Sequence, residues 1–317
     1  MGHHARSWSR RRSRNGGRGV KDHGRLLGIL ALVGTSIVWG TTGTAATLAP
    51  GVGPLAIGSA ALGVGGLLQA VVAMPQLQAA TSELKENRAT VIVGALALWI
   101  YPLAFYSSMH FAGVAVGSVI SLATAPLFSG LLEWVIDRRP LGSWWVVAAS
   151  LGVVGAVLLA SSDLRVESAG GASMALGIGL GLVAAATYAT YSWAAKDLMN
   201  RGVSRAAAMG SIFGLGGLAL IPVLLVTGAP IVASREAFAV AAYMALIPMF
   251  LGYLMFGYGL TKVPASTATT ITLVEPAVAA VLAVWFVGER LTPTGWVGIA
   301  LFALVLAIVS VAPPPRR

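Results

Sequence analysis

The chain has 317 residues, of which 57% are hydrophobic and 10% are charged, with a mean hydropathy of +0.82 and a formal net charge of +10. So few charged residues could not cover the surface of a soluble domain, and the composition therefore indicates a membrane protein. Cysteine is absent, which excludes disulfides and thiolate metal sites. The patterns HExxH, GxSxG and GxxxxGK[ST] are absent too, which leaves an enzymatic function with little support.

Residues 1–25 form a basic arm with eight basic side chains and one acid, Asp22. Basic arms often bind nucleic acid, but this one directly precedes a long apolar span. That position favours a disordered cytoplasmic arm that sets the topology and touches anionic lipid, with no nucleic-acid partner. A cleaved signal peptide is the main alternative for the first span, although its basic region would be unusually long.

Ten stretches after the arm are long and apolar enough to cross a bilayer, which takes about 20 residues each. The third and fourth stretches, and the eighth and ninth, are joined by very short turns that predict antiparallel hairpins. The predicted fold is an all-α integral membrane protein with ten transmembrane helices. The spans are 26–47, 54–74, 90–110, 113–135, 142–161, 172–195, 207–227, 237–259, 264–287 and 292–311.

Basic residues separate to the two sides of the membrane when the chain is threaded through these spans. With the N-terminus in the cytoplasm, 18 of the 21 Lys and Arg residues fall on the cytoplasmic side, and three, Arg165, Arg235 and Arg290, on the other. Cytoplasmic loops are enriched in Lys and Arg. The sequence therefore predicts a multi-pass protein of the cytoplasmic (inner) membrane with both termini in the cytoplasm.

Two segments about 150 residues apart repeat the same pattern, Tyr106 to Gly142 and Phe256 to Thr292. Sliding one onto the other pairs Pro126 with Pro276, in the middle of each apolar span. Each half, 26–161 and 172–311, holds five spans, and because five is odd the second half must be inverted relative to the first. Inverted repeats are typical of secondary transporters, whose site lies between the halves.

Glu275 is the acid predicted to lie near the middle of a span, where a carboxylate should face the bundle interior, be paired or be protonated. Pro276 follows it and, like Pro126, should kink its helix because proline donates no backbone hydrogen bond. Ser266, Thr269 and Thr272 precede it at intervals of three and predict a polar cavity wall. A structural role at the kink is the alternative to contact with a solute or proton. The matching position in the first half is Ala125.

Aromatic residues supply a second set of candidates for a cavity lining. Tyr188 and Tyr191 are three residues apart and share a helix face. Buried tyrosine hydroxyls need partners, which a wet central cavity would supply. Ordinary packing between helices is the alternative. The predicted substrate-binding residues are Trp39, Thr42, Tyr101, Tyr188, Tyr191, Tyr253, Thr269, Thr272 and Glu275, with Glu275 also the candidate for ion coupling.

Two further acids are predicted to lie near span ends. Glu133 stands close to the turn Asp137-Arg138-Arg139, which favours an interfacial ion partner over a transport acid. Glu289 and Arg290 occupy the matching turn on the other face, where we expect them to orient the tenth helix.

Clustered glycines in the second, sixth and seventh spans predict close helix packing, with local bending during transport as the alternative.

The order of these motifs resembles the EamA branch of the drug/metabolite transporter superfamily. The resemblance rests on WGTTGTAATL, SLATAPLFSGLLEWV, AAATYATYSWAAKDL and LVEPAVAAVLAVWFVGERLTPTGWVGIAL, and it extends from Leu26 to Val311. It implies ten helices in two inverted five-helix repeats, and export of amino acids, related metabolites or drugs. The family's glutamate-proline pair falls on Glu275 and Pro276. The first-half turn departs from the family's glycine-glutamate-arginine pattern.

We therefore expect a secondary transporter that moves small organic solutes outward by alternating access. Import, facilitated diffusion, a membrane enzyme and a non-transporting scaffold are the alternatives. The expected partners are a small solute and membrane lipid, without a cofactor or metal, and a monomer is compatible with the sequence.

Overall fold

The computed structural model describes residues 5–161, 171–282, 284–285 and 292–311. Within these residues, helices make up nearly all of the structure and no strand occurs. Ten segments are long and apolar enough to cross a membrane, which confirms the predicted all-α fold with ten transmembrane helices. Most of the segment 162–171 between the two halves, and the turn with Glu289 and Arg290, lie outside the described residues.

The first half of the chain contains spans one to five. Its elements are α1 (Ala5–Thr47), α2 (Pro54–Gly58), the π-helical η1 (Ser59–Val64), α3 (Gly65–Val72), α4 (Met74–Ala79), α5 (Thr81–Glu86), α6 (Arg88–Ala112), α7 (Val114–Ala123), α8 (Ala125–Val135) and α9 (Ser143–Ser161). The second span combines α2, η1 and α3, and the fourth combines α7 and α8. Gly113, with a φ of 84°, is the one-residue turn between the third and fourth spans.

The second half contains spans six to ten. Its elements are α10 (Gly171–Asn200), α11 (Arg205–Thr227), α12 (Ala229–Ala233), α13 (Arg235–Met244), the π-helical η2 (Ala245–Leu251), α14 (Gly252–Lys262), α15 (Ala265–Ile271), the 3-10 turn η3 (Thr272–Val274), α16 (Glu275–Leu282) and α17 (Pro293–Val311). The eighth span runs through α13, η2 and α14. The ninth runs through α15, η3 and α16.

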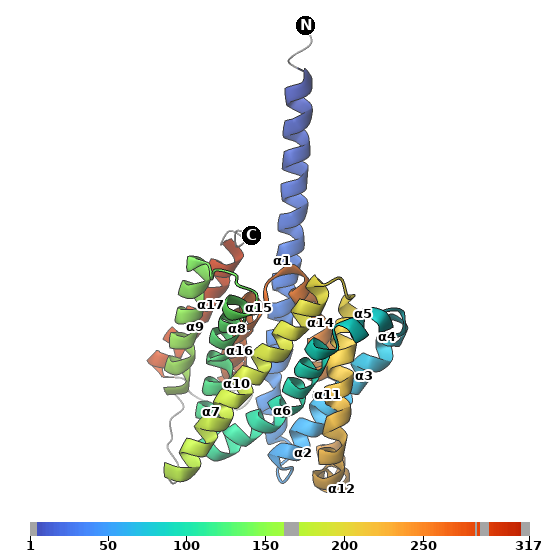
Figure 1. Ribbon diagram of the computed structural model, residues 1–317. Coiled ribbons are helices and arrows are strands. Elements are labelled where there is room, and N and C mark those ends of the chain that lie inside the picture. The colour runs from blue at the N-terminus through green and yellow to red at the C-terminus, as the bar shows by residue number, and fades with distance from the viewer. Residues whose placement is uncertain (1–4, 162–170, 283, 286–291, 312–317) are drawn as a thin grey trace.

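The basic arm differs from the disordered segment that the sequence predicted. Helix α1 begins at Ala5 and continues without a break into the first span, so that it projects far beyond the rest of the bundle (Figure 1). Extending an existing helix is much easier than nucleating a new one, and arginine is a good helix former. We call the end of the bundle from which α1 projects the arm side, and the opposite end the far side.

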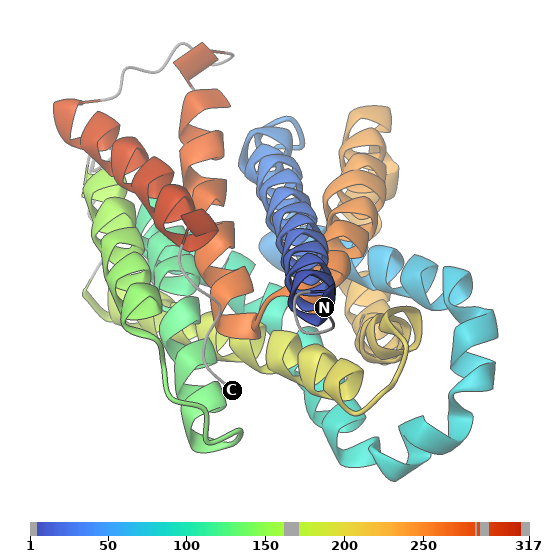
Figure 2. The same ribbon diagram turned by 90° about the horizontal axis from the view of Figure 1, so that it is seen from above.

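The two halves are interleaved rather than separate. Helix α1 of the first half packs against α14 and α16 of the second, α3 packs against α11, α6 against α10, and α9 against α17. Seen along the bundle, α9 and α17 form one flank, and α1 lies between α16 and the helices of the eighth span (Figure 2). Because each half has five spans, α10 runs toward the arm side while α1 runs away from it.

Glycines permit the closest of these helix contacts. A Cβ atom added to Gly217 of α11 would stand 2.8 Å from the carbonyl oxygen of Gly63, and one added to Gly298 of α17 would stand 2.6 Å from that of Gly155. Such short separations leave no room for a side chain, so these backbones can approach only as glycines. The clustered glycines of the second and seventh spans therefore contribute to packing between the halves.

Both repeated spans are interrupted near their middle. Helix α7 ends before Thr124, and Pro126 lies in the first turn of α8. The Thr124 hydroxyl donates to the carbonyl oxygen of Ile120 at 2.6 Å, and the backbone N–H of Thr124 donates to the same oxygen at 3.4 Å. In the second half, η3 separates α15 from α16 directly before Glu275 and Pro276. The breaks thus fall at the two prolines that the sequence singled out as kinks.

Candidate functional site

Aromatic rings from both halves meet at the centre of the bundle. Trp39 of α1 lies 4.7 Å from Tyr253 of α14, and Tyr101 of α6 lies 5.6 Å from both Tyr188 and Tyr191 of α10, measured between ring centroids. Tyr188, Tyr191 and Tyr253 are almost fully buried. These separations are typical of favourable aromatic pairs, so four helices from the two halves are joined by direct ring contacts.

The side-chain polar atoms of Trp39, Tyr188, Tyr191 and Tyr253 have hydrogen-bond partners. The Tyr188 hydroxyl lies 2.8 Å from Thr272 Oγ1, and the hydroxyls of Tyr191 and Tyr253 lie 2.6 Å apart. Trp39 Nε1 donates to the carbonyl oxygen of Pro248 in η2 at 2.9 Å. Buried tyrosine and tryptophan groups normally require such partners. The bond from Trp39 to Pro248 links the two halves, whereas the two tyrosine bonds lie within the second half.

A central cavity lies beside this cluster, toward the far side. Its volume of about 20 Å³ is sufficient for about one water molecule. An organic solute can therefore enter only if the helices separate. Its lining includes the predicted residues Trp39, Thr42, Tyr101, Tyr253 and Glu275, together with Gly58, Ala61, Leu62, Pro102, Phe105, Tyr106 and Met249.

Glu275 occupies an unusual position in this lining. It is half-buried, it begins α16, and its carboxylate has no hydrogen bond or ion pair with any described residue. Helix α1 packs closely here, since a Cβ atom on Gly40 would lie 3.0 Å from the Glu275 carbonyl oxygen. The first turn of a helix favours a negative charge, which partly accounts for a carboxylate at this depth. The matching Ala125 is fully buried and carries no polar group.

Ser266, Thr269 and Thr272, which the sequence predicted to form a polar cavity wall, are not part of the lining of the central cavity. Thr269 Oγ1 donates to carbonyl oxygens of its own helix, at Ala265 and Ser266, both 3.1 Å away. Thr272 reaches the aromatic cluster only through Tyr188. Tyr188, Tyr191 and Thr272 therefore support the residues that face the cavity, and Thr269 meets this group only through its main-chain oxygen, which accepts from Thr272 Oγ1 at 3.0 Å.

Sequence reasoning left several lining residues out of the predicted set. Tyr101, Pro102, Phe105 and Tyr106 are spaced so that they share one face of α6, and this periodicity could have added Tyr106 to the candidates. Gly58, Ala61 and Leu62 of the second span, and Met249 of the eighth, carry no polar signal. Nothing in their residue types distinguishes them from ordinary packing residues.

Glu133 was expected to pair with basic residues of the turn after α8, but the structure gives it a different partner. Its Oε1 accepts from the backbone N–H of Ser266 at 3.1 Å, and its Oε2 accepts from the Ser266 hydroxyl at 2.6 Å. The carboxylate is buried, and it satisfies a donor at the start of α15. An acid of the first half thus caps a helix of the second half.

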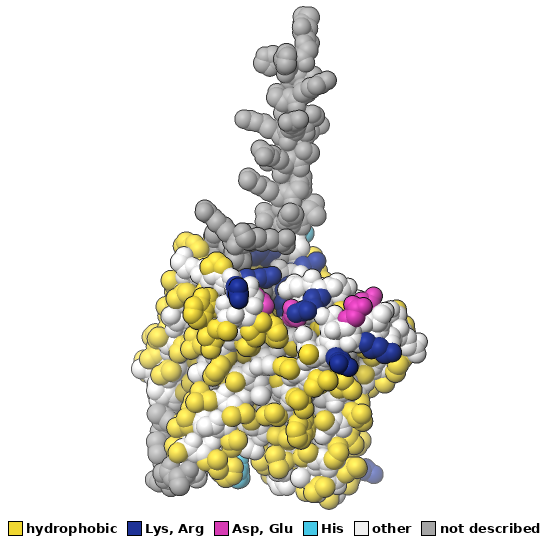
Figure 3. Space-filling view, viewed as in Figure 1, with side chains coloured by type: hydrophobic (Ala, Val, Ile, Leu, Met, Phe, Trp, Pro, Cys, Tyr) yellow, Lys and Arg dark blue, Asp and Glu magenta, His cyan; other side chains and the backbone are white. Residues whose placement is uncertain are grey.

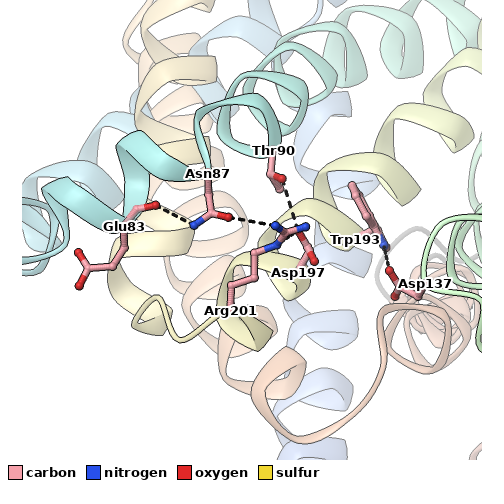
Figure 4. A network of polar contacts seen from close by, with 7 residues as sticks. All are labelled: Glu83, Asn87, Thr90, Asp137, Trp193, Asp197 and Arg201. Atoms are coloured by element: carbon pink, nitrogen blue, oxygen red, sulfur yellow. Dashed lines mark hydrogen bonds and ion pairs between the residues drawn. The ribbon is translucent and has the colours of Figure 1, made fainter.

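Polar contacts between the halves continue on the arm side, in a set of bonds that we call the arm-side layer. Arg201, which pairs with Asp197 at 2.7 Å, also donates to the Asn87 side-chain oxygen at 3.2 Å (Figure 4). Trp193 Nε1 donates to Asp137 at 3.1 Å. These bonds join α10 to segments of the first half on the arm side.

No metal centre is evident in the part of the chain that the structure describes. In those ranges, no group of three or more His, Cys, Asp or Glu side chains is placed to hold a metal ion. The arrangement offers instead one carboxylate, ring faces and hydroxyls around a small cavity. Such a set of groups can bind and release a small organic solute, with the carboxylate facing its positive charge.

Comparison with known proteins agrees with the architecture. The family described as "EamA-like transporter family" matches residues 26–161 and again 175–311. An uncharacterized transporter of Bacillus subtilis, YwfM, is 36% identical over 302 residues, which cover 93% of this chain and 97% of that protein. The threonine/homoserine exporter RhtA of Escherichia coli K12 is 27% identical over 84% of each chain.

Two further matches extend the comparison. A probable terminal-alkyne amino-acid exporter of Streptantibioticus cattleyicolor is 28% identical over 57% of this chain and 59% of its own length. A solved structure superposes with a TM-score of 0.71 over 89% of this chain and 95% of the other, at 16% identity, which shows the fold alone. The chain belongs to the EamA-like transporter family of the drug/metabolite transporter superfamily, and it carries the family domain twice.

Proposed function

We propose that this transporter exports small organic solutes that carry an amino group, such as amino acids or related metabolites, by alternating access between its inverted halves. The observation that carries the proposal is Glu275, a carboxylate without a partner among the described residues, in a cavity walled by aromatic rings. An ammonium group would neutralise this charge and pack against the ring faces.

The rest of the lining supports the same class of solute. Trp39, Tyr101 and Tyr253 offer ring surfaces, and Thr42 offers a hydroxyl, while none of the described lining residues is basic. A multiply charged anion would therefore meet no compensating charge. The family's transporter names argue against an enzyme, and the exporter names of two relatives support outward movement of amino acids.

The contacts between the halves on the arm side support a specific order of steps. The cavity lies on the far side of the aromatic cluster, so a solute from the arm side can reach Glu275 only after the cluster and the arm-side layer separate. Solute and proton would compete for the same carboxylate, which couples export to proton entry. Facilitated diffusion is the second candidate, because the cavity would also admit a solute without a proton.

Flux into proteoliposomes tests this proposal. Purified protein is reconstituted, and uptake of a panel of labelled amino acids and amines is measured with and without a pH gradient. We expect Glu275→Gln to lower the initial rate for the preferred amine by about tenfold or more, because it removes a charged partner worth roughly 1.5–3 kcal/mol. The control is Glu236→Gln, which changes an exposed glutamate in the first turn of α13.

The possible outcomes test the site, the proton coupling and the solute class separately. Equal rates for Glu275→Gln and the unmodified protein on every amine would overturn the assignment of the site. A lowered rate that keeps the same dependence on the pH gradient would retain the site and exclude proton coupling through Glu275. Transport of anions in preference to amines would contradict the solute class.

A further inference from the structure

A second pocket lies on the arm side, where α1, the turn between α8 and α9, and the ends of α15 and α17 come together. Its volume of about 110 Å³ exceeds that of the central cavity. Arg25 and Arg139 line it, together with Glu133, Ser266, Trp144 and Trp145. It is separate from the aromatic cluster, and the proposed export mechanism does not use it.

The charge of this pocket favours an anion. Arg25 Nη2 donates to the carbonyl oxygen of Val309 at 2.8 Å, which holds the guanidinium at the end of α17. Arg139 is exposed on the turn after α8. The acid in the lining, Glu133, directs both carboxylate oxygens to Ser266. Two arginines and one acid line the pocket, so the basic side chains outnumber the acidic one. Arginine suits phosphate because its donors form a planar fork.

The surroundings of the pocket place it at the membrane surface. Trp144 and Trp145 lie in the first turn of α9, and tryptophan is enriched where the hydrocarbon meets the headgroups. Trp134, Val135 and Ile136, just before the turn, are each more than half exposed. Basic side chains gather on this same end of the bundle (Figure 3). A soluble anion would not contact the exposed apolar side chains of Trp134, Val135 and Ile136, whereas the acyl chains of a phospholipid would cover them.

We propose that this arm-side pocket binds the phosphate-bearing headgroup of an anionic phospholipid. The phosphate would face Arg25 and Arg139, and the acyl chains would lie along the exposed apolar residues beside Trp144. Such a lipid contacts α1 and the α8–α9 turn of the first half and α15 and α17 of the second. It would thus strengthen the arm-side connection between the halves without touching the central cavity.

Lipid-dependent thermal stability of the purified full chain tests this site. Apparent melting temperatures are measured while phosphatidylglycerol, phosphatidylcholine or inorganic phosphate is added. We expect phosphatidylglycerol alone to raise the melting temperature, and Arg139→Gln to weaken its apparent affinity by about fivefold, the effect of one basic residue at an anionic surface. The matched control is Arg138→Gln, which removes the same charge from the same turn but not from the pocket lining.

A second variant keeps the test decisive if Arg139→Gln does not fold. Thr267→Phe places bulk in the pocket while both arginines remain, and we expect it to lose the phosphatidylglycerol effect as well. Equal losses in Arg138→Gln and Arg139→Gln would overturn the proposal in favour of diffuse surface attraction. An equal effect of phosphate would indicate a soluble-anion site, and an equal effect of phosphatidylcholine would exclude selection by charge.

Discussion

At the scale of single residues, Gln69 of α3 stands out because its amide is buried without a partner. The side chain is 2% exposed, and neither Nε2 nor Oε1 forms a hydrogen bond with a described residue. A buried polar group in that condition destabilises the folded state by roughly 1–3 kcal/mol. Gln69 is not part of the central cavity, so stability rather than transport should respond to its replacement.

We expect Gln69→Leu to raise the apparent melting temperature of the purified protein, because leucine fills a similar volume without an unpaired amide. The matched comparison is Ser108→Ala, which removes a hydroxyl that donates to the Gly177 carbonyl oxygen at 2.7 Å and should therefore lower the melting temperature. A fall in melting temperature for Gln69→Leu would show that the amide has a partner, such as a buried water molecule.

In the ninth span, residue spacing predicted which side chains are polar, but it did not predict which groups those side chains contact. The sequence showed that Ser266, Thr269 and Thr272 recur every third position, but not that each has a different partner. Serine and threonine within a helix often bond to a carbonyl oxygen three or four residues earlier, as Thr269 does, and spacing does not reveal this. Glu275 was recognisable because an acid deep in an apolar span is rare.

At the scale of elements, α10 is one of the helices that connect the two halves on the arm side. Through Arg201 it reaches Asn87, before α6, and through Trp193 it reaches Asp137, after α8. The far side of α10 has its own link, from Ser108 Oγ to Gly177. Opening toward the arm side must break the first two bonds, whereas the third can remain.

We expect the double variant Asn87→Ala with Trp193→Phe to favour the conformation that is open on the arm side. Since the chain has no cysteine, a single Ala61→Cys reports on the central cavity without background. Loss of about 1 kcal/mol of hydrogen bonding should lower its labelling from the far side by about fivefold. Glu83→Gln is the control, since Asn87 bonds only the main-chain oxygen of Glu83. Unchanged labelling in the double variant would contradict a gating role for the arm-side layer.

The interruptions of the fourth and ninth spans could be predicted from the sequence, because a proline inside a helix removes a backbone hydrogen bond at a known position. The π-helical segments η1 and η2 were not visible, although both contribute to the cavity lining. Apart from Pro248 in η2, their residues are ordinary for a membrane helix, and the extra residue in each turn depends on how the second and eighth spans pack on each other.

At the scale of the whole molecule, the arm side and the far side differ in charge, which predicts their orientation in the membrane. Lys85, Arg88, Arg201, Arg205 and Lys262 stand at the arm-side ends of their helices, and Arg235 stands at the far side. This distribution favours a cytoplasmic arm side.

We expect a membrane-impermeant thiol reagent to label Glu236→Cys in intact cells, and Glu83→Cys only after permeabilisation. Both positions are exposed glutamates in the first turn of a short helix, one on each side, and acidic residues contribute little to topology, so the pair is matched. The reverse pattern would invert the proposed orientation.

The contact between Glu133 and Ser266 has a consequence for the synthesis of the protein. Glu133 enters the membrane with the fourth span, but the donors that satisfy it arrive with the ninth. During translation the first half therefore holds this acid without its Ser266 partner until five more spans have been inserted. The first half alone is consequently an incomplete folding unit, and the last helices to leave the ribosome complete the first ones.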